Sequence, residues 1–239
     1  MRKTGLLFVT LGIILVVAAC GGSSGGAAPT STASSVQSQP TSASTQSTVT
    51  QETQPALESG TRLTIENGTT ASYVVREQLA GVNFPTDAIG TTDLVTGQIV
   101  LDSNGAVMPE ASSLSVDLRG LKSDDSRRDN YIRQNTLQTN NFPTADFTAT
   151  GVTGLASPLP SSGEATFQVN GDMTIRGITR PMTWDVAATF SGDRVTGTTT
   201  ASFTFDDYGM RAPSVFIVLS VEDTIHLKIE FTMAVERTG

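Results

Sequence analysis

The feature that most constrains the fold is a strict alternation of residue character near the end of the sequence. Between residues 224 and 235, Ile225, Leu227, Ile229, Phe231, Met233 and Val235 alternate with Thr224, His226, Lys228, Glu230, Thr232 and Ala234. Successive side chains of a β-strand point to opposite faces, so this pattern predicts a strand with one buried face. The segment is therefore expected to form one half-buried strand of a sheet.

The same period of two recurs from about residue 60 onward. It is clear in residues 114–118, 167–175 and 182–190, and weaker in residues 73–79, 97–101, 145–149 and 195–205, which gives eight strands with the last segment. Residues 61–66 add a ninth candidate strand. Asn67-Gly68 follows it and is a strong turn signal, which predicts a hairpin between residues 61–66 and 73–79.

One segment has helical character. Residues 124–138 begin with acids, Ser123 or Asp124 is a plausible N-cap, and Asn140, Asn141 and Pro143 would end the helix. Its apolar positions are few, so we expect a short lid or plug. Many strands with one helix favour an all-β fold, an antiparallel eight-stranded barrel with one short helix, because an open sheet would leave long exposed edges. A sandwich is the alternative.

The N-terminal residues 1–19 have the layout of a secretory signal peptide. Arg2 and Lys3 precede an uncharged run of about 15 residues, short of the roughly 18 to 20 that cross a bilayer as a helix. The run ends in Val17-Ala18-Ala19-Cys20, which resembles the bacterial lipobox. We therefore expect lipidation of Cys20, with acyl chains that anchor the chain to the cell membrane outside the cytoplasm. An ordinary signal peptide, with Cys20 a bystander, is the alternative.

Residues 20–59 have a composition that cannot form a core. They are almost entirely Ser, Thr, Gly, Ala, Gln and Pro, with Glu52 and Glu58 as the only charges, which predicts a disordered tether. O-glycosylation or passage through a wall polymer stays open. Loss of the two positive charges of the signal changes the formal net charge from −8 to −10. Such an acidic chain is a poor candidate for nucleic-acid binding.

Residues 60–239 are expected to form the barrel domain. An eight-stranded barrel is either filled by its own side chains or just wide enough for one ligand. The residues expected to point inward are Val75, Leu79, Ile99, Leu101, Leu114, Val116, Phe147, Phe167, Val169, Met173, Trp184, Phe203, Leu227, Ile229 and Phe231. They suit an alkyl chain, and the small residues Gly171, Ala188, Gly197 and Ala201 favour a cavity. A filled barrel, acting as a structural or protein-interaction module, is the alternative.

Polar residues offer little for catalysis. His226 is the only histidine and lies on the polar face of the last strand, and Cys20 is the only cysteine, so neither a metal cluster nor a nucleophile with a base is expected. The acid pairs 124–125, 206–207 and 222–223 are expected to cap turns. Arg127, Arg128 and Arg133 are candidates for the polar end of a ligand, although Asp124, Asp125 and Asp129 are equally good partners for them.

The apolar run 213–219 has no clean alternation, and it fits a barrel mouth or a partner surface as well as a buried edge. An exposed apolar edge would favour a homodimer.

Four blocks in order resemble the YceI-like family. They are residues 72–80 with 88–92, residues 127–133 with 141–147, residues 171–181, and residues 205–210 with 221–223. The sequence departs from commoner members in lacking a histidine in the first strand, and in Asp207-Tyr208-Gly209-Met210 standing for their Asp-Phe-Gly-[Ile/Met]. The resemblance implies a lipocalin-like barrel that binds an isoprenoid lipid such as a quinone or polyprenyl chain. We therefore expect a membrane-tethered binding protein and not an enzyme.

Overall fold

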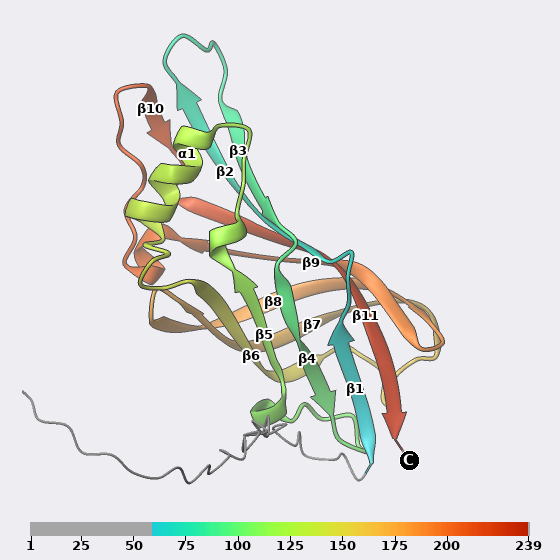
Figure 1. The fold of residues 1–239 in the computed structure, drawn as a ribbon. Helices are drawn as coiled ribbons and strands as arrows, with labels where there is room; N and C mark the ends of the chain where they lie inside the picture. Colours follow the sequence, from blue (N-terminus) through green and yellow to red (C-terminus); the bar gives the residue numbers. More distant parts are fainter. Residues whose placement is uncertain (1–58, 239) are drawn as a thin grey trace, which may run out of the picture. The chain divides into compact units, whose positions relative to one another are not determined.

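The computed structural model describes residues 59–238, and the predictions for the signal peptide, for Cys20 and for the tether lie outside them. The strands are β1 (Gly60–Ile65), β2 (Thr70–Leu79), β3 (Thr86–Thr92), β4 (Val95–Leu101), β5 (Ser113–Asp117), β6 (Thr144–Thr153), β7 (Ser162–Ile175), β8 (Ile178–Ser191), β9 (Arg194–Thr204), β10 (Val218–Val221) and β11 (Thr224–Thr238). One α-helix, α1 (Ser126–Tyr131), continues into a π-helical turn at Ile132–Thr136. Figure 1 shows this arrangement.

The sheet closes on itself. The order β1-β4-β5-β6-β7-β8-β9-β11 is a path of neighbouring antiparallel strands, and β1 also pairs with β11. These eight strands form a closed antiparallel barrel, as predicted, but the ring contains the ninth candidate strand, β1, in place of β2, which was one of the eight predicted strands. The sandwich alternative is wrong. Closure pairs both edges of the sheet, which removes the exposed edge that a sheet of this size would otherwise carry.

The predicted hairpin at Asn67-Gly68 is wrong. β1 and β2 do not pair with each other; they follow one another along β11, β1 opposite residues 233–238 and β2 opposite residues 226–230. Thr69 joins the two at a buried position, where its Oγ1 donates to the carbonyl of Thr232 and accepts from the Thr232 amide. The chain therefore bends at this point without reversing.

Two strands lie outside the predicted set. β2 continues past the closed ring, and β3 and β10 pair with its two sides. Figure 1 shows this three-stranded extension at one end of the barrel. The inward positions of β3 are Ala88, Gly90 and Thr92, so small and polar residues hide its period of two. The run at 213–219 becomes a loop that leads into β10, and it is not a buried edge.

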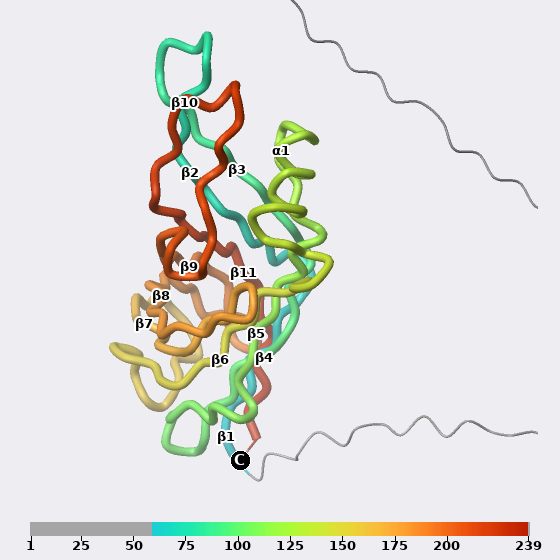
Figure 2. Tube along the Cα trace, turned by 90° about the vertical axis from the view of Figure 1, so that its left-hand side faces the viewer, coloured from blue at the N-terminus to red at the C-terminus, as the bar shows by residue number. Residues whose placement is uncertain are grey.

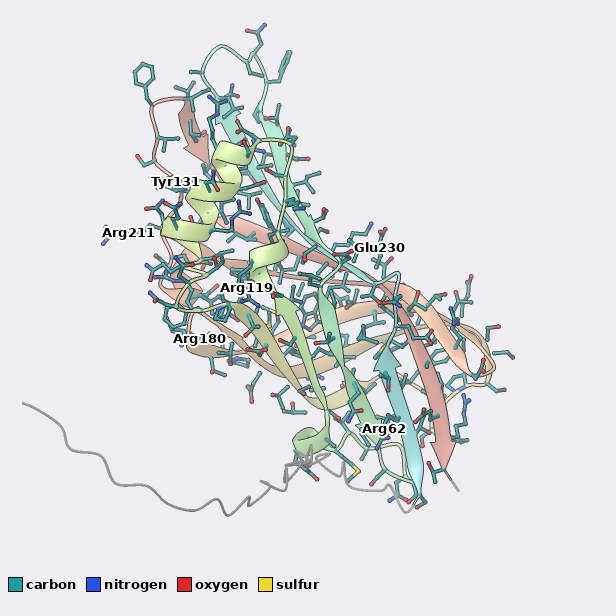
Figure 3. The ribbon with its side chains drawn as sticks, viewed as in Figure 1. Arg62, Arg119, Tyr131, Arg180, Arg211 and Glu230 are labelled. Carbon is teal, nitrogen blue, oxygen red and sulfur yellow. The ribbon has the colours of Figure 1, made fainter. Side chains whose placement is uncertain are left out.

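The helix is shorter than predicted. α1 begins with Asp125 as its N-cap, and the carboxylate accepts from the Arg127 amide, which corrects the expectation of Ser123 or Asp124. It lies at the end of the barrel that β2, β3 and β10 extend, on the side away from β10 (Figure 2). Figure 3 places Tyr131 of this helix and Arg211 at the same end. The helix is thus a lid beside the barrel mouth and not a plug within the barrel.

Candidate functional site: an apolar cavity in the barrel

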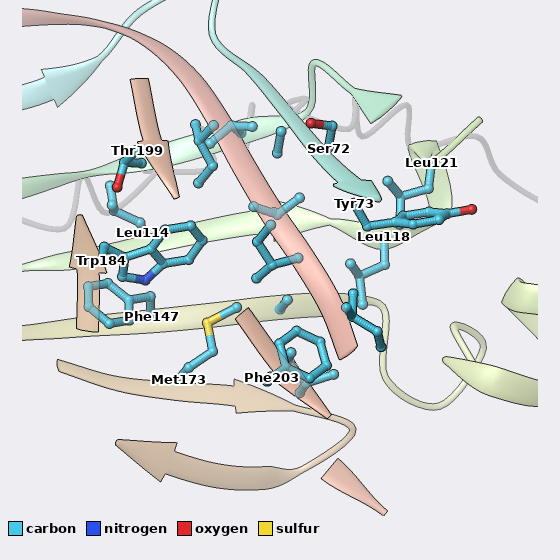
Figure 4. A pocket seen from close by; sticks show the side chains of 18 of the residues that line it. Ser72, Tyr73, Leu114, Leu118, Leu121, Phe147, Met173, Trp184, Thr199 and Phe203 are labelled. Carbon is cyan, nitrogen blue, oxygen red and sulfur yellow. The ribbon is translucent and has the colours of Figure 1, made fainter. Parts of the chain in front are cut away.

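An apolar cavity of about 550 Å³ occupies the barrel interior and continues toward α1. Its lining is almost entirely apolar and comes from every strand, from α1 and from residues 213–218. All fifteen residues expected to point inward line it. Figure 4 shows Trp184 and Phe147 together at one end of the cavity, and Tyr73, Leu118 and Leu121 at the other.

Strand register explains why these side chains meet. Phe147 on β6 lies opposite Met173 on β7, and Trp184 on β8 lies opposite Val169 on β7. Because alternate residues of each strand face inward, the three strands bring their large side chains to one surface. The rings of Phe147 and Trp184 meet edge to face with centroids 6.2 Å apart, a favourable aromatic geometry.

The small residues on the inner face were expected to leave the cavity open, and this expectation is wrong. The cavity lining contains none of the four, which are Gly171, Ala188, Gly197 and Ala201. A Cβ at Gly171 would overlap the Phe147 ring and the Thr148 carbonyl, and one at Gly197 would overlap the Phe231 ring. These glycines let neighbouring aromatic rings lie against the sheet.

The polar end of the cavity is an ion-pair cluster that joins β2 to α1. The Arg128 guanidinium donates to Glu77 Oε1 at 2.7 Å, and it also contacts the Asp124 carboxylate. Glu77 is buried and lines the cavity on the same face of β2 as Val75 and Leu79. The period of two along β2 therefore predicts an inward position for Glu77. It was missed in the sequence because only apolar residues were considered at inward positions.

Tyr73 also lines this end and was not predicted. Its ring lies over Gly90 on the neighbouring strand, where a Cβ would overlap it. Burial of the phenol disfavours the charged phenolate and raises the pKa of Tyr73 to about 12. The tyrosine therefore remains a neutral hydroxyl over the whole physiological range.

The three candidate arginines do not converge. Arg127 and Arg128 line the cavity, but Arg133 does not; it donates instead to the Leu121 carbonyl and to Asn130. Arg127 is exposed and pairs with Asp125, and hydrogen bonds from Arg127 lower the pKa of Asp125 to about 2. All three arginines thus have protein partners, and contact with a ligand's polar end stays a prediction for Arg127 and Arg128.

Other polar residues behave as structural groups. Asp125 caps α1, and Asp207 accepts from Thr204 in a capping box, which confirms the turn-capping expectation for these two acids. His226 is exposed. Among residues 59–238, no three metal-ligating side chains gather in one place. Within the same range, no helix has the length and apolar character of a membrane span.

Two of the four blocks that resemble the YceI-like family, residues 171–181 and residues 205–210, lie against each other in the structure. Arg176 and Gly177 form the tight turn between β7 and β8, both with positive φ, and the Arg176 guanidinium donates to the Gly209 carbonyl at 2.6 Å. Gly209 follows the turn Phe205–Tyr208, in which the Tyr208 ring is fully buried against Phe203.

The model of the YceI-like domain family matches residues 35–233 of this chain. The chain belongs to the YceI-like family.

Relatives and solved structures agree with this assignment. A UPF0312 protein of Pseudomonas putida strain W619 is 33% identical over 135 residues, 52% of this chain and 64% of that protein. One of Azotobacter vinelandii is 33% identical over 131 residues, with the same shares of 52% and 64%. These alignments cover less than two thirds of the length of either relative.

Among solved structures, the YceI-like barrel is similar to a polyisoprenoid binding domain from Saccharophagus degradans, with a TM-score of 0.54 and 12% identity over 73% of this chain and 98% of that one. It is also similar to BcnA of Burkholderia cenocepacia, with a TM-score of 0.51 and 16% identity over 70% of this chain and 98% of that one. At these identities the likeness establishes the shared fold.

Proposed function

We propose that this protein binds one apolar isoprenoid-type lipid, a quinone or a polyprenyl chain, inside the barrel. The observation that carries the proposal is the continuous apolar cavity of about 550 Å³. The fold shared with a protein described as a polyisoprenoid binding domain supports the choice of lipid. A filled barrel has no such cavity, so the cavity weighs against a purely structural module.

The size of the cavity sets the scale of binding. At about 30 Å³ for a water-sized group, 550 Å³ has room for about 18 carbon-sized groups. Burying each contributes about 0.8 kcal/mol, so the gross gain is about 14 kcal/mol before the cost of ordering the chain. That gain is large enough for tight binding of a chain that leaves part of its length outside.

The two ends of the cavity differ in chemistry. Phe147, Trp184 and Met173 offer an apolar surface at the deep end, apart from the buried indole N–H of Trp184. Glu77, Arg128 and Tyr73 bring polar groups to the end beside α1. The lipid would therefore enter the cavity with its apolar tail first and leave its polar head near α1. Ligand polar groups there would meet hydrogen-bonding side chains, which reduces the cost of removing them from water.

The proposal extends to where the protein acts. The sequence of residues 1–20 supports export, lipidation at Cys20 and anchoring to the bacterial membrane, and residues 20–59 would hold the barrel clear of the lipid headgroups. The protein would then be an extracytoplasmic carrier or buffer and not an enzyme. The intact mass of the purified protein should exceed that of the peptide from residue 20 by the mass of its acyl groups, and a Cys20→Ser variant should lack this excess; a parent protein without the excess would contradict the lipid anchor.

The test of binding uses Trp184, which is the only tryptophan of the sequence and lines the cavity. Titration with an isoprenoid quinone should quench its fluorescence to a stoichiometric endpoint, because the quinone would lie inside the barrel. A quinone without a tail, at the same concentration, is the control and should give no saturable quenching. Mass spectrometry of a solvent extract of the natively purified protein then identifies the cargo. An empty extract together with no saturable quenching would overturn the proposal.

A further inference from the structure

Two loops at the end of the β2 extension carry most of the exposed apolar surface of the described residues. Six of the eight large apolar side chains that are exposed in residues 59–238 belong to them. We call these six the apolar rim: Val82 and Phe84 after β2, and Val215, Phe216, Ile217 and Leu219 around the start of β10. Soluble monomers seldom gather such side chains in one place, so the rim indicates a contact surface.

Hydrogen bonds hold the two loops of the rim in place. The Ala80 amide donates to the Ile217 carbonyl at 2.8 Å, and Val218 pairs with Leu79. Gln78 donates through its side-chain amide to the Val82 carbonyl, which holds the first loop. The two loops therefore present their apolar side chains together. The Phe84 side chain is 77% exposed and the Phe216 side chain is entirely exposed.

Charge is absent from the segments that carry the rim, although the exposed Arg211 precedes the second segment and the chain as a whole has a net charge of −8. No Asp, Glu, Lys or Arg occurs in residues 80–86 or in residues 212–221. Insertion into the interface of a lipid bilayer would thus require no charged side chain to lose water. Phe and Leu side chains are also those that interfacial membrane-binding elements commonly bury.

The rim is continuous with the cavity. Val215 and Ile217 are exposed and at the same time line the cavity, and so does the neighbouring Val218. The cavity therefore reaches the surface between the rim and α1. A lipid that left a bilayer at this point would pass along apolar side chains all the way into the barrel.

We propose that the apolar rim docks on the surface of a lipid bilayer, with Phe84 and Phe216 inserted among the lipids and the mouth of the cavity facing the membrane. The docking step stands on the rim alone, whereas its purpose, the exchange of an apolar lipid with the bilayer, rests on the proposed function. A second copy of the chain is a poorer occupant, because a standard stable interface needs about 20 to 30 residues from each partner and the rim is the tip of two short loops.

The test uses the chain from residue 20 with Cys20→Ser, so that no acyl chain anchors it, and phosphatidylcholine vesicles free of isoprenoids. Flotation should carry this protein with the vesicles. The variant Phe84→Ser/Phe216→Ser should bind at least about tenfold more weakly, since burying one aromatic ring contributes about a factor of ten or more. The variant Ile89→Ser/Leu94→Ser removes two large apolar residues outside the rim, which are 47% and 48% exposed, and it should float like the parent.

The outcomes separate this inference from the proposed function. Equal flotation of all three proteins, or none, would overturn the docking inference. Concentration-dependent dimers in sedimentation velocity that Phe84→Ser/Phe216→Ser abolishes, without vesicle binding, would assign the rim to a second copy instead. Vesicle binding without quenching of Trp184 by quinone would contradict the proposed isoprenoid ligand and leave the docking inference supported. If the parent protein both docks on vesicles and binds quinone, transfer of quinone from vesicles to the barrel should be at least about tenfold slower in Phe84→Ser/Phe216→Ser than in the parent.

Discussion

A hollow barrel and a filled barrel respond in opposite ways to a larger side chain on the inner wall. Ala145 on β6 is buried and lines the cavity, so Ala145→Leu tests the space directly. Leucine adds three carbon atoms, which fill about 90 Å³ at about 30 Å³ for each group. At about 24 cal/mol for each Å³ of void filled, less the leucine rotamer entropy of about 0.5 to 1 kcal/mol, the empty protein should gain about 1.5 kcal/mol in its free energy of unfolding.

The same substitution should weaken lipid binding. Three carbon-sized groups of the cargo lose their place, and at about 0.8 kcal/mol each the affinity falls by about 2.4 kcal/mol, or about 50-fold. Urea denaturation of solvent-extracted protein measures the first effect, and quenching of Trp184 measures the second. Thr148→Leu, on the exposed outer face of the same strand, should change neither. A loss of about 1 to 3 kcal/mol in Ala145→Leu would mean overpacking and would refute the hollow interior at this point.

Three further predictions concern the polar end. Arg128→Ala should lower the free energy of unfolding by about 3 kcal/mol in urea denaturation, because it removes the guanidinium bound to buried Glu77, and adding Glu77→Leu should restore most of it. Since the pKa of Tyr73 is about 12 in the fold and about 10 when unfolded, stability should fall between pH 10 and pH 12, and less so in Tyr73→Phe. Gly90→Ala should cost about 1 to 3 kcal/mol through overlap with the Tyr73 ring, and Tyr73→Ala should remove that penalty.

The ring of strands was predictable because a closed barrel buries one face of every strand. Each pair of inward neighbours, such as Leu227 and Ile229 or Phe167 and Val169, then carries the period of two in its own sequence. The same parity places all of the predicted inward residues in the cavity lining. Apolar alternation is therefore enough to identify the wall of this barrel without knowledge of the pairing order.

The errors come from interactions that no local pattern records. Asn67-Gly68 is a hairpin signal, yet β11 is long enough to pair with β1 and β2 in turn, and Thr69 bonds to it at the junction. Gly171 looked like empty volume because the ring that occupies the space belongs to Phe147 on the next strand. Glu77 was passed over because its cation, Arg128, lies 51 residues away in sequence.

The two sides of the cavity mouth differ in a way that decides which of them suits a membrane. Residues 124–133 on the α1 side contain three aspartates and three arginines, and Arg127 and Arg128 are held in ion pairs there. The rim side has no charged side chain in residues 212–221. Burial of the α1 side in lipid would cost the hydration of these charges, whereas burial of the rim would gain free energy from each apolar side chain. The barrel would therefore approach a bilayer through the rim, with α1 and its ion pairs left in water beside the mouth, where the polar head of a bound lipid would lie.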